Sequence, residues 1–156
     1  CVSISLPDEN YRYVTIGHSR LLFCVNKDNP LAREQINSLQ QIGQTPLVML
    51  SDHYSQTKYL KRLFHKENCK PNVIQYTSQV FTIFQHIREN AAAGFLSEDI
   101  ARQDKELVSF VLQEVDAASI TMIRRKGAKT FPAVDTFIHY IRNIKKNLNS
   151  AMPPLP

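Results

Sequence analysis

The sequence is poor in the residues that several kinds of functional site require. Its 156 residues include 4 glycines, 3 cysteines and no tryptophan. With so few glycines, a glycine-rich phosphate loop is difficult to place anywhere in the chain. No Gly-x-Ser-x-Gly nucleophile elbow occurs either. The composition therefore argues against nucleotide-binding enzymes and against serine hydrolases of the α/β type.

The cysteines Cys1, Cys24 and Cys69 are odd in number and irregularly spaced. They do not form a disulfide pattern, which predicts a reducing, cytoplasmic location. No run approaches the length of about 18 apolar residues that a membrane span needs, so no membrane association is expected. The chain has no signal peptide or starting methionine, and it opens on a strand-like alternation at 2–6, so we expect an excised fragment. A lipid-modified Cys1 is disfavoured because no flexible polar tether follows it.

The charge balance is basic, with a formal net charge of +5. Basic residues are spread over several segments rather than gathered in a dense arginine run. Solvated basic faces are therefore favoured over direct contact of this segment with DNA. Hydrophobic residues make up 43% and charged residues 21%, values that are ordinary for a soluble globular protein.

Hydrophobic periodicity predicts strands alternating with helices, which is typical of an α/β fold with a mainly parallel sheet. The expected strands are 2–6, 11–16, 20–26, 46–50, 72–76, 94–96, 107–112 and 119–124. The expected helices are a short one at 36–42, one at 55–67, one after Thr77 or Ser78 as cap that runs to Ala91, a turn at 97–100, and a closing helix.

The closing helix is the clearest of these predictions. Thr130 is placed to cap it, and Pro132 lies in the first turn, where a missing N–H costs nothing. Its apolar residues recur at helical spacing and are expected to form a buried stripe. They are Phe131, Val134, Phe137, Ile138, Ile141 and Ile144.

Two arrangements could indicate an enzyme or a metal protein, but both are weak. His65 and Cys69 lie four residues apart, yet two ligands do not make a zinc site and no third follows at a fitting spacing. Cys24 lies in an apolar strand, so a buried structural thiol is favoured over a nucleophile. We therefore expect no catalytic residue, metal or cofactor.

Three stretches, in the right order, resemble the effector-binding domain of LysR-type transcription regulators. Residues 21–32, LLFCVNKDNPLA, are similar to the family's crossing strand and its His-Pro-Leu-Ala-like turn, with Asn29 in the place of the histidine. Residues 76–96 match a strand, an amphipathic helix and an apolar strand, with Ser97 replacing the usual proline. Residues 119–127 resemble the last strand and the Arg-Lys-Gly-like turn.

The resemblance implies a periplasmic-binding-protein-like type II fold, an α/β architecture of two lobes with mainly parallel sheets. Residues 1–25 would be crossing and first-lobe strands, and 26–104 the second lobe. Residues 105–148 would return to the first lobe and end in the closing helix, and 149–156 would be a tail. The family's first lobe starts further upstream, so the first lobe is expected to be incomplete.

Ligands of open α/β sheets bind at the carboxyl ends of the strands. Two loops expected there lead into helices whose unpaired N-terminal amides attract anions. Taken singly, the Ser and Thr residues are also ordinary helix caps, His53 an ordinary loop residue and Phe95 an ordinary core residue. The candidate effector contacts are Ser51, His53, Ser55, Thr57, Thr77, Ser78, Gln79 and Phe95.

In LysR-type regulators a small molecule bound between the lobes controls DNA binding by an N-terminal winged helix-turn-helix, which this chain lacks. The resemblance implies a non-enzymatic domain that senses a small anion, with carboxylates the first class to consider. Promoter DNA would be bound only through the missing N-terminal domain, and the intact regulator would be a homodimer or tetramer. The alternative is a solute-binding protein of a transport system, which shares the fold and would have a signal peptide upstream.

Overall fold

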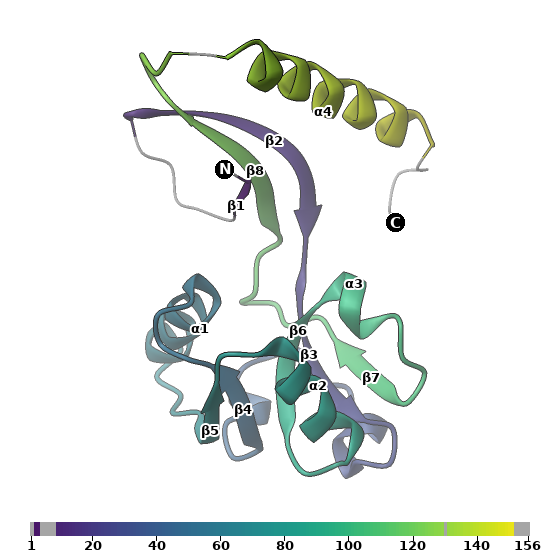
Figure 1. Cartoon of the computed structure of the whole chain (residues 1–156). Helices are drawn as coiled ribbons and strands as arrows, with labels where there is room; N and C mark the ends of the chain where they lie inside the picture. The colour runs from purple at the N-terminus through teal and green to yellow at the C-terminus, as the bar shows by residue number, and fades with distance from the viewer. Residues whose placement is uncertain (1, 4–8, 130, 152–156) are drawn as a thin grey trace. The chain divides into compact units, whose positions relative to one another are not determined.

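The computed structural model describes residues 2–3, 9–129 and 131–151. The chain divides into two compact units (Figure 1). The first unit combines Cys1–His18 with Ser119–Pro156, and the second unit is Ser19–Ala118. The second unit is continuous in sequence and contains both large hydrophobic cores.

A five-stranded sheet forms the centre of the second unit (Figure 1). Its order is β5-β4-β6-β3-β7. The strands are β3 (Leu21–Asn26), β4 (Pro46–Leu50), β5 (Asn72–Thr77), β6 (Ala93–Ser97) and β7 (Leu107–Phe110). Because β3 and β7 pair within this sheet, the unit is wider than the range 26–104 expected for a second lobe.

The strand directions correct one expectation, because the sheet is mixed rather than mainly parallel. β4 runs parallel to β5 and β6, whereas β3 runs antiparallel to β6 and β7. Parallel neighbours need a long crossover connection. The helices α1 (Ser55–Lys66) and α2 (Val80–Arg88) supply it between β4, β5 and β6, but no such helix precedes β4.

The sequence located α1 correctly, and other boundaries differ. α2 ends at Arg88 rather than near Ala91. The expected helix at 36–42 is reduced to the 3-10 turn η2 (Gln40–Ile42), with a second 3-10 turn, η1 (Pro30–Arg33), before it. The turn expected at 97–100 is the short helix α3 (Glu98–Ala101).

Alternation along the buried strands creates two separate cores. In β4, Leu47 and Met49 face one side and Val48 and Leu50 the other, as the period of two requires. The first side packs against Leu60 and Phe64 of α1. The other side packs against Ile83 and Ile87 of α2. The two helices therefore cover opposite faces of the sheet.

Helix α2 lies unusually close to the sheet at Gly94 of β6. A Cβ atom at this position would lie 2.5 Å from Cγ2 of Ile83 and 3.3 Å from Cδ1 of Ile87. Both isoleucines are at most 1% exposed, so neither side chain can swing into solvent. The absence of a side chain at Gly94 is what permits this approach.

Gly94→Ala should therefore lower the free energy of unfolding by about 1–3 kcal/mol, because it overpacks the core under α2. Gly17→Ala is the matched control, since its Cβ would meet only Ile120 at 4.0 Å. Its effect should stay within about 0.5 kcal/mol. Urea unfolding followed by circular dichroism measures both, and equal effects would contradict this view of the packing.

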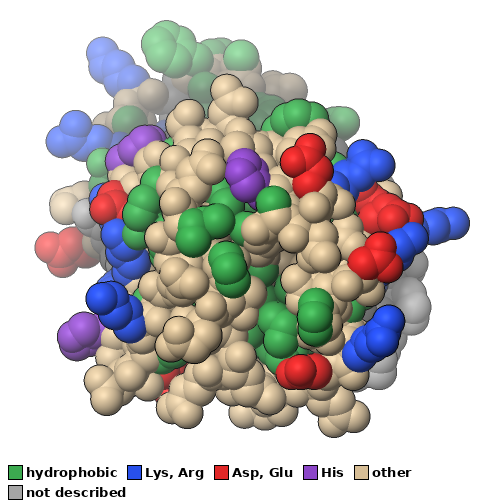
Figure 2. All heavy atoms as spheres, turned by 90° about the horizontal axis from the view of Figure 1, so that it is seen from below, with side chains coloured by type: hydrophobic (Ala, Val, Ile, Leu, Met, Phe, Trp, Pro, Cys, Tyr) green, Lys and Arg blue, Asp and Glu red, His purple; other side chains and the backbone are tan. Residues whose placement is uncertain are grey.

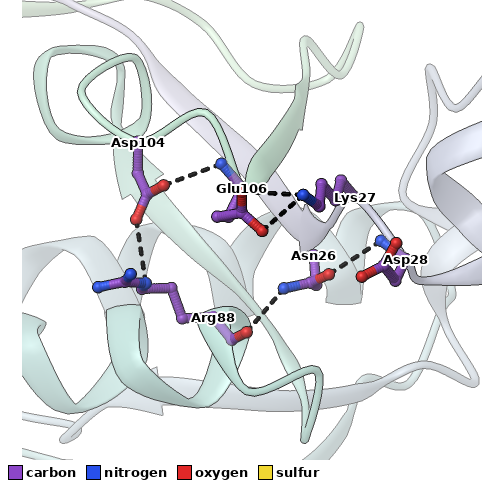
Figure 3. Close-up of polar contacts among 6 residues, drawn as sticks. All are labelled: Asn26, Lys27, Asp28, Arg88, Asp104 and Glu106. Atoms are coloured by element: carbon purple, nitrogen blue, oxygen red, sulfur yellow. Dashed lines mark hydrogen bonds and ion pairs between the residues drawn. The ribbon is translucent and has the colours of Figure 1, made fainter.

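A polar network joins the end of β3 to the end of α2 and to the loop before β7 (Figure 3). The side chain of Asn26 is 5% exposed. Its Nδ2 donates to the carbonyl of Arg88 at 2.7 Å, and its Oδ1 accepts from the amide of Asp28 at 2.8 Å. Around it, Lys27 pairs with Glu106 at 2.8 Å and Arg88 with Asp104 at 3.3 Å.

Asn26→Ala should lower the free energy of unfolding by about 1–3 kcal/mol, because it leaves nearly buried backbone groups without partners. Lys27→Gln removes an ion pair between side chains that are about half exposed and screened by solvent, so it should lower the free energy of unfolding by much less than Asn26→Ala does. The comparison of the two midpoints in urea is the test. A larger fall in the urea midpoint for Lys27→Gln than for Asn26→Ala would show that the ion pairs, rather than the hydrogen bonds of Asn26, stabilise this region.

The first unit contains a three-stranded sheet and one long helix (Figure 1). Its strands β1 (Val2–Ser3), β2 (Tyr11–Ser19) and β8 (Ala118–Arg125) have the order β1-β8-β2. Residues 4–6 of the predicted first strand, the predicted cap Thr130 and the end of the predicted tail lie outside the described residues.

The closing helix is present as α4 (Pro132–Ala151), but its stripe is not buried as predicted. Phe131 just before it is 71% exposed, and Val134 and Phe137 are 40% and 47% exposed. Ile138 and Ile141 are half-buried, and the side chain of Ile144 lies outside the described residues. Periodicity identifies the apolar face of a helix, but not whether a partner covers it.

Candidate functional site

The carboxyl ends of β4, β5 and β6 lie at one edge of the sheet, because these strands run in the same direction. We call this the carboxyl edge. The loops that leave it are joined to one another. The amide of Ser51 donates to the carbonyl of Thr77 at 2.8 Å, and Oη of Tyr54 donates to the carbonyl of Ser78 at 2.8 Å. The predicted convergence of the two loops is therefore observed.

Two helices begin at this edge without side-chain caps, which corrects the predicted caps. The N-cap residue of α1 is Tyr54 and that of α2 is Gln79, and neither side chain makes a capping hydrogen bond. Ser55 is already the first helical residue. Thr77 ends β5, where its Oγ1 accepts from the amide of Gln79 at 3.2 Å. The first amides of both helices have no intrahelical acceptor, as in any helix.

Two candidate side chains are used internally. Thr57 is fully buried and its Oγ1 donates to the carbonyl of Leu50 at 2.7 Å. Phe95 is 2% exposed, and its ring packs in the core 5.7 Å from that of Phe23 and 6.4 Å from that of Phe64. Both side chains are therefore buried inside the second unit and are not exposed at the carboxyl edge. The exposed or half-exposed candidates are Ser51, His53, Ser55, Thr77, Ser78 and Gln79.

The charged groups near the edge are mostly paired. Asp52 accepts a hydrogen bond from Nζ of Lys61 at 2.6 Å. This hydrogen bond is the largest cause of the raised pKa of Lys61, and a hydrogen bond with Tyr76 is the second. Glu98 pairs with Arg102 one turn further along the chain. Within the part of the chain that the structure describes, Arg20 makes no ion pair, although its carbonyl accepts from the amide of Glu98 at 2.8 Å.

His53 belongs to the same loop as Asp52, and its ring contacts that of Tyr54 in a tilted arrangement, with 4.3 Å between the ring centroids. Tyr54 and Gln56 lie in a loop that the sequence placed at this edge, but they were not among the predicted contacts, and Arg20 was not considered. Gln56 donates from Nε2 to the carbonyl of Phe95 at 3.2 Å, which ties the start of α1 to β6. The loop at 51–57 was recognised, but long-range bonds of this kind leave no signal in a single sequence.

The residues considered for enzymatic chemistry have other environments. Cys24 is fully buried, and this burial raises the pKa of its thiol to about 12. The thiol is therefore protonated near neutral pH, as a structural residue would be. His65 and Cys69 both line a groove beside α1. Among the described residues, no group of three or more His, Cys, Asp and Glu side chains could hold a metal ion.

The surface does not concentrate charge on the face that Figure 2 presents. Lysine and arginine side chains lie mainly around its margin together with acidic ones, and small groups of hydrophobic side chains lie between them (Figure 2).

None of the helices in the described ranges 2–3, 9–129 and 131–151 has the length and apolar character needed to cross a bilayer.

A family model described as the LysR substrate binding domain matches residues 2–145. The chain belongs to this family. A curated relative, the uncharacterized HTH-type transcriptional regulator YybE of Bacillus subtilis strain 168, is 24% identical over 158 residues. The match covers 90% of this chain and 49% of YybE, so the chain spans about half the length of that relative.

Solved structures share the fold of this LysR substrate-binding domain. The regulatory domain of Synechocystis PCC6803 CcmR in complex with 2-PG is 18% identical with a TM-score of 0.84, over 94% of this chain and 73% of that one. The effector-binding domain of QuiR in complex with shikimate is 15% identical with a TM-score of 0.81, over 94% and 71%. Full-length CbnR with its target DNA is 16% identical with a TM-score of 0.76, over 93% and 52%. The predicted fold class is therefore confirmed.

The internal role of Thr57 in this LysR substrate-binding domain is testable. Thr57→Val keeps the shape of the side chain but removes the donor to Leu50, and should lower the free energy of unfolding by about 1–3 kcal/mol. Ser55→Ala removes an exposed hydroxyl that caps nothing, and its effect should stay within about 0.5 kcal/mol. If chemical denaturation shows no difference between these variants, the buried hydrogen bond is not important for stability.

Proposed function

We propose that this LysR substrate-binding domain senses a small anion, with carboxylates as the first class, at the carboxyl edge of its second unit. The observation that supports this is the pair of uncapped helix starts at one edge, with Ser55 and Val80 as first helical residues. Unpaired amides and the helix dipole together favour a negative group at such positions. The ring of His53 also belongs to a loop of this edge, and the backbone of Arg20 is bonded to Glu98 just beyond the end of β6.

The relatives support a sensing role of this kind. QuiR was solved with shikimate and CcmR with 2-PG, while CbnR was solved on its target DNA. In our proposal, the second unit is the second lobe, and anion binding shifts the domain toward one of its conformations. A winged helix-turn-helix in the intact regulator then contacts promoter DNA.

The remaining features of the proposal are taken by analogy with the family. In this proposal the intact regulator is a cytoplasmic, non-enzymatic homodimer or tetramer. The sparse, unpatterned cysteines agree with a reducing compartment, where disulfides are rare. A solute-binding protein has the same kind of fold, but the family model that matches is that of the regulators and no observation favours transport.

Proline substitution at the first helical positions tests the anion site directly. Ser55→Pro and Val80→Pro each remove one N–H, and proline is well tolerated at this position of a helix. The preceding residues have the extended backbone that proline requires, with ψ of 137° at Tyr54 and 124° at Gln79. Each substitution should weaken carboxylate binding about tenfold, the effect of losing one hydrogen bond to a charged group.

The measurement is the rise in melting temperature of the 156-residue chain in shikimate and in benzoate, with neutral benzamide as the ligand control. Ser55→Ala controls for loss of the hydroxyl, and Ser78→Ala asks whether that side chain contacts the anion. An equal rise in the proline variants and the wild type would remove the helix starts from the site. No rise with either carboxylate would contradict the proposal as a whole.

A further inference from the structure

The chain passes between its two units twice, after His18 and after Ala118. We call residues 111–118, which lead up to the second passage, the return segment. Almost all of it lies outside helices and strands, because β7 ends at Phe110 and β8 begins at Ala118. Within the first unit the two passages lie beside each other, since Nδ1 of His18 is 3.5 Å from Oγ of Ser119. A movement of one unit against the other must act through the few residues at these places.

The return segment is anchored to the second unit by apolar side chains and by hydrogen bonds. Leu112 and Val115 are at most 4% exposed and belong to the core under α1. The carboxylate of Glu114 accepts from an amide in the segment before β4. The last of these anchors is the amide of Asp116, which donates to Oη of Tyr59 at 3.0 Å. Tyr59 therefore holds the chain two residues before the end of the second unit.

Both passages are bonded to helices that begin at the carboxyl edge. Tyr59 lies at the start of the second turn of α1, four residues after the first helical residue, Ser55. The first passage is attached through Arg20, whose carbonyl accepts from the amide of Glu98, the first residue of α3. α3 follows β6 directly, so it too begins at this edge. A change at the helix starts can therefore reach both passages over a short distance.

Tyr59 lies on the flank of α1 that faces the return segment. Lys61 lies on the opposite flank, where its Nζ is 4.9 Å from the ring centroid of Tyr76 of β5. Residues two positions apart on a helix point about 200° apart, which explains why these two side chains have different neighbours. The side chain of Tyr59 packs against the core under α1, and its hydroxyl makes an internal contact of the second unit. This hydroxyl can be removed by substitution without loss of the ring.

We propose that the hydrogen bond between Oη of Tyr59 and the amide of Asp116 is a latch that couples an anion at the carboxyl edge to the return segment. This inference rests on the function proposed above. An anion on the first amides of α1 holds the first turn of the helix in place and so favours the closed latch. Without the anion the latch opens more often. By linkage, a latch that favours the bound state also strengthens anion binding by the same factor.

Tyr59→Phe removes the latch and keeps the packing of the ring. In the wild type, saturating benzoate should slow hydrogen exchange of the Asp116 amide about threefold, the order of one neutral hydrogen bond. NMR of the 156-residue chain measures this exchange. In Tyr59→Phe the amide should exchange faster, and benzoate should no longer slow it. The variant should also bind benzoate about threefold more weakly, because Tyr59 positions the segment although it does not contact the ligand.

Glu114→Ala is the matched control, because it removes another anchor of the same segment. Its carboxylate accepts from the amide of Leu39 at 3.3 Å, in a segment that precedes β4 and does not leave the carboxyl edge. Exchange at Leu39 should become faster, whereas the affinity for benzoate and its effect on Asp116 should match the wild type. Tyr140→Phe removes a hydroxyl from a 61% exposed side chain of α4 and should change neither.

The possible outcomes separate the latch from the anion site. If benzoate binds but exchange at Asp116 does not respond, or if Tyr59→Phe binds benzoate as the wild type does, the latch is overturned and the anion site stands. An equal loss of affinity in Tyr59→Phe and Glu114→Ala would make Tyr59 an ordinary anchor and would also overturn the latch. If neither benzoate nor shikimate raises the melting temperature of the wild type, the anion site and the latch fail together.

Discussion

Burial of the five-stranded sheet on both faces is the constraint on which the rest of the second unit depends. β3, β4 and β6 alternate their side chains between a core under α1 and a core under α2. Each buried aromatic ring removes about 150–250 Å² from water, and Phe23, Phe64 and Phe95 meet in one of these cores. With both faces apolar, polar groups that can meet a ligand are confined to the two ends of the strands and to the outermost strands.

The two ends of the strands are used differently. At one end, Asn26 and the ion pairs around it satisfy the backbone where β3, α2 and the loop before β7 come together (Figure 3). At the carboxyl edge the helix starts of α1 and α2 have no side-chain caps. The first amides of these helices have no intrahelical acceptor. They are the groups that we propose to bind an anion.

Much of the fold could be predicted because it depends on local pattern. Periodicity located α1 and the buried strands, and the order of three stretches predicted the family. Strand direction was harder to predict, because it depends on which strands become neighbours in the sheet. The antiparallel pairing of β3 with β6 and β7 was missed for that reason. The stripe of α4 was predicted as buried, although amphipathic spacing states only which face is apolar and not what covers it.

The candidate site was only partly predictable, and the reason is chemical. Ser, Thr and Asn suggest helix caps, yet Ser55 caps nothing and Thr57 bonds within the core. The groups proposed to bind the anion are backbone amides, which every residue except proline possesses. A site of that kind leaves almost no signature in residue identity. Selectivity among anions would then come from exposed side chains of the same loops, such as His53 and Ser78, which can change without changing the fold.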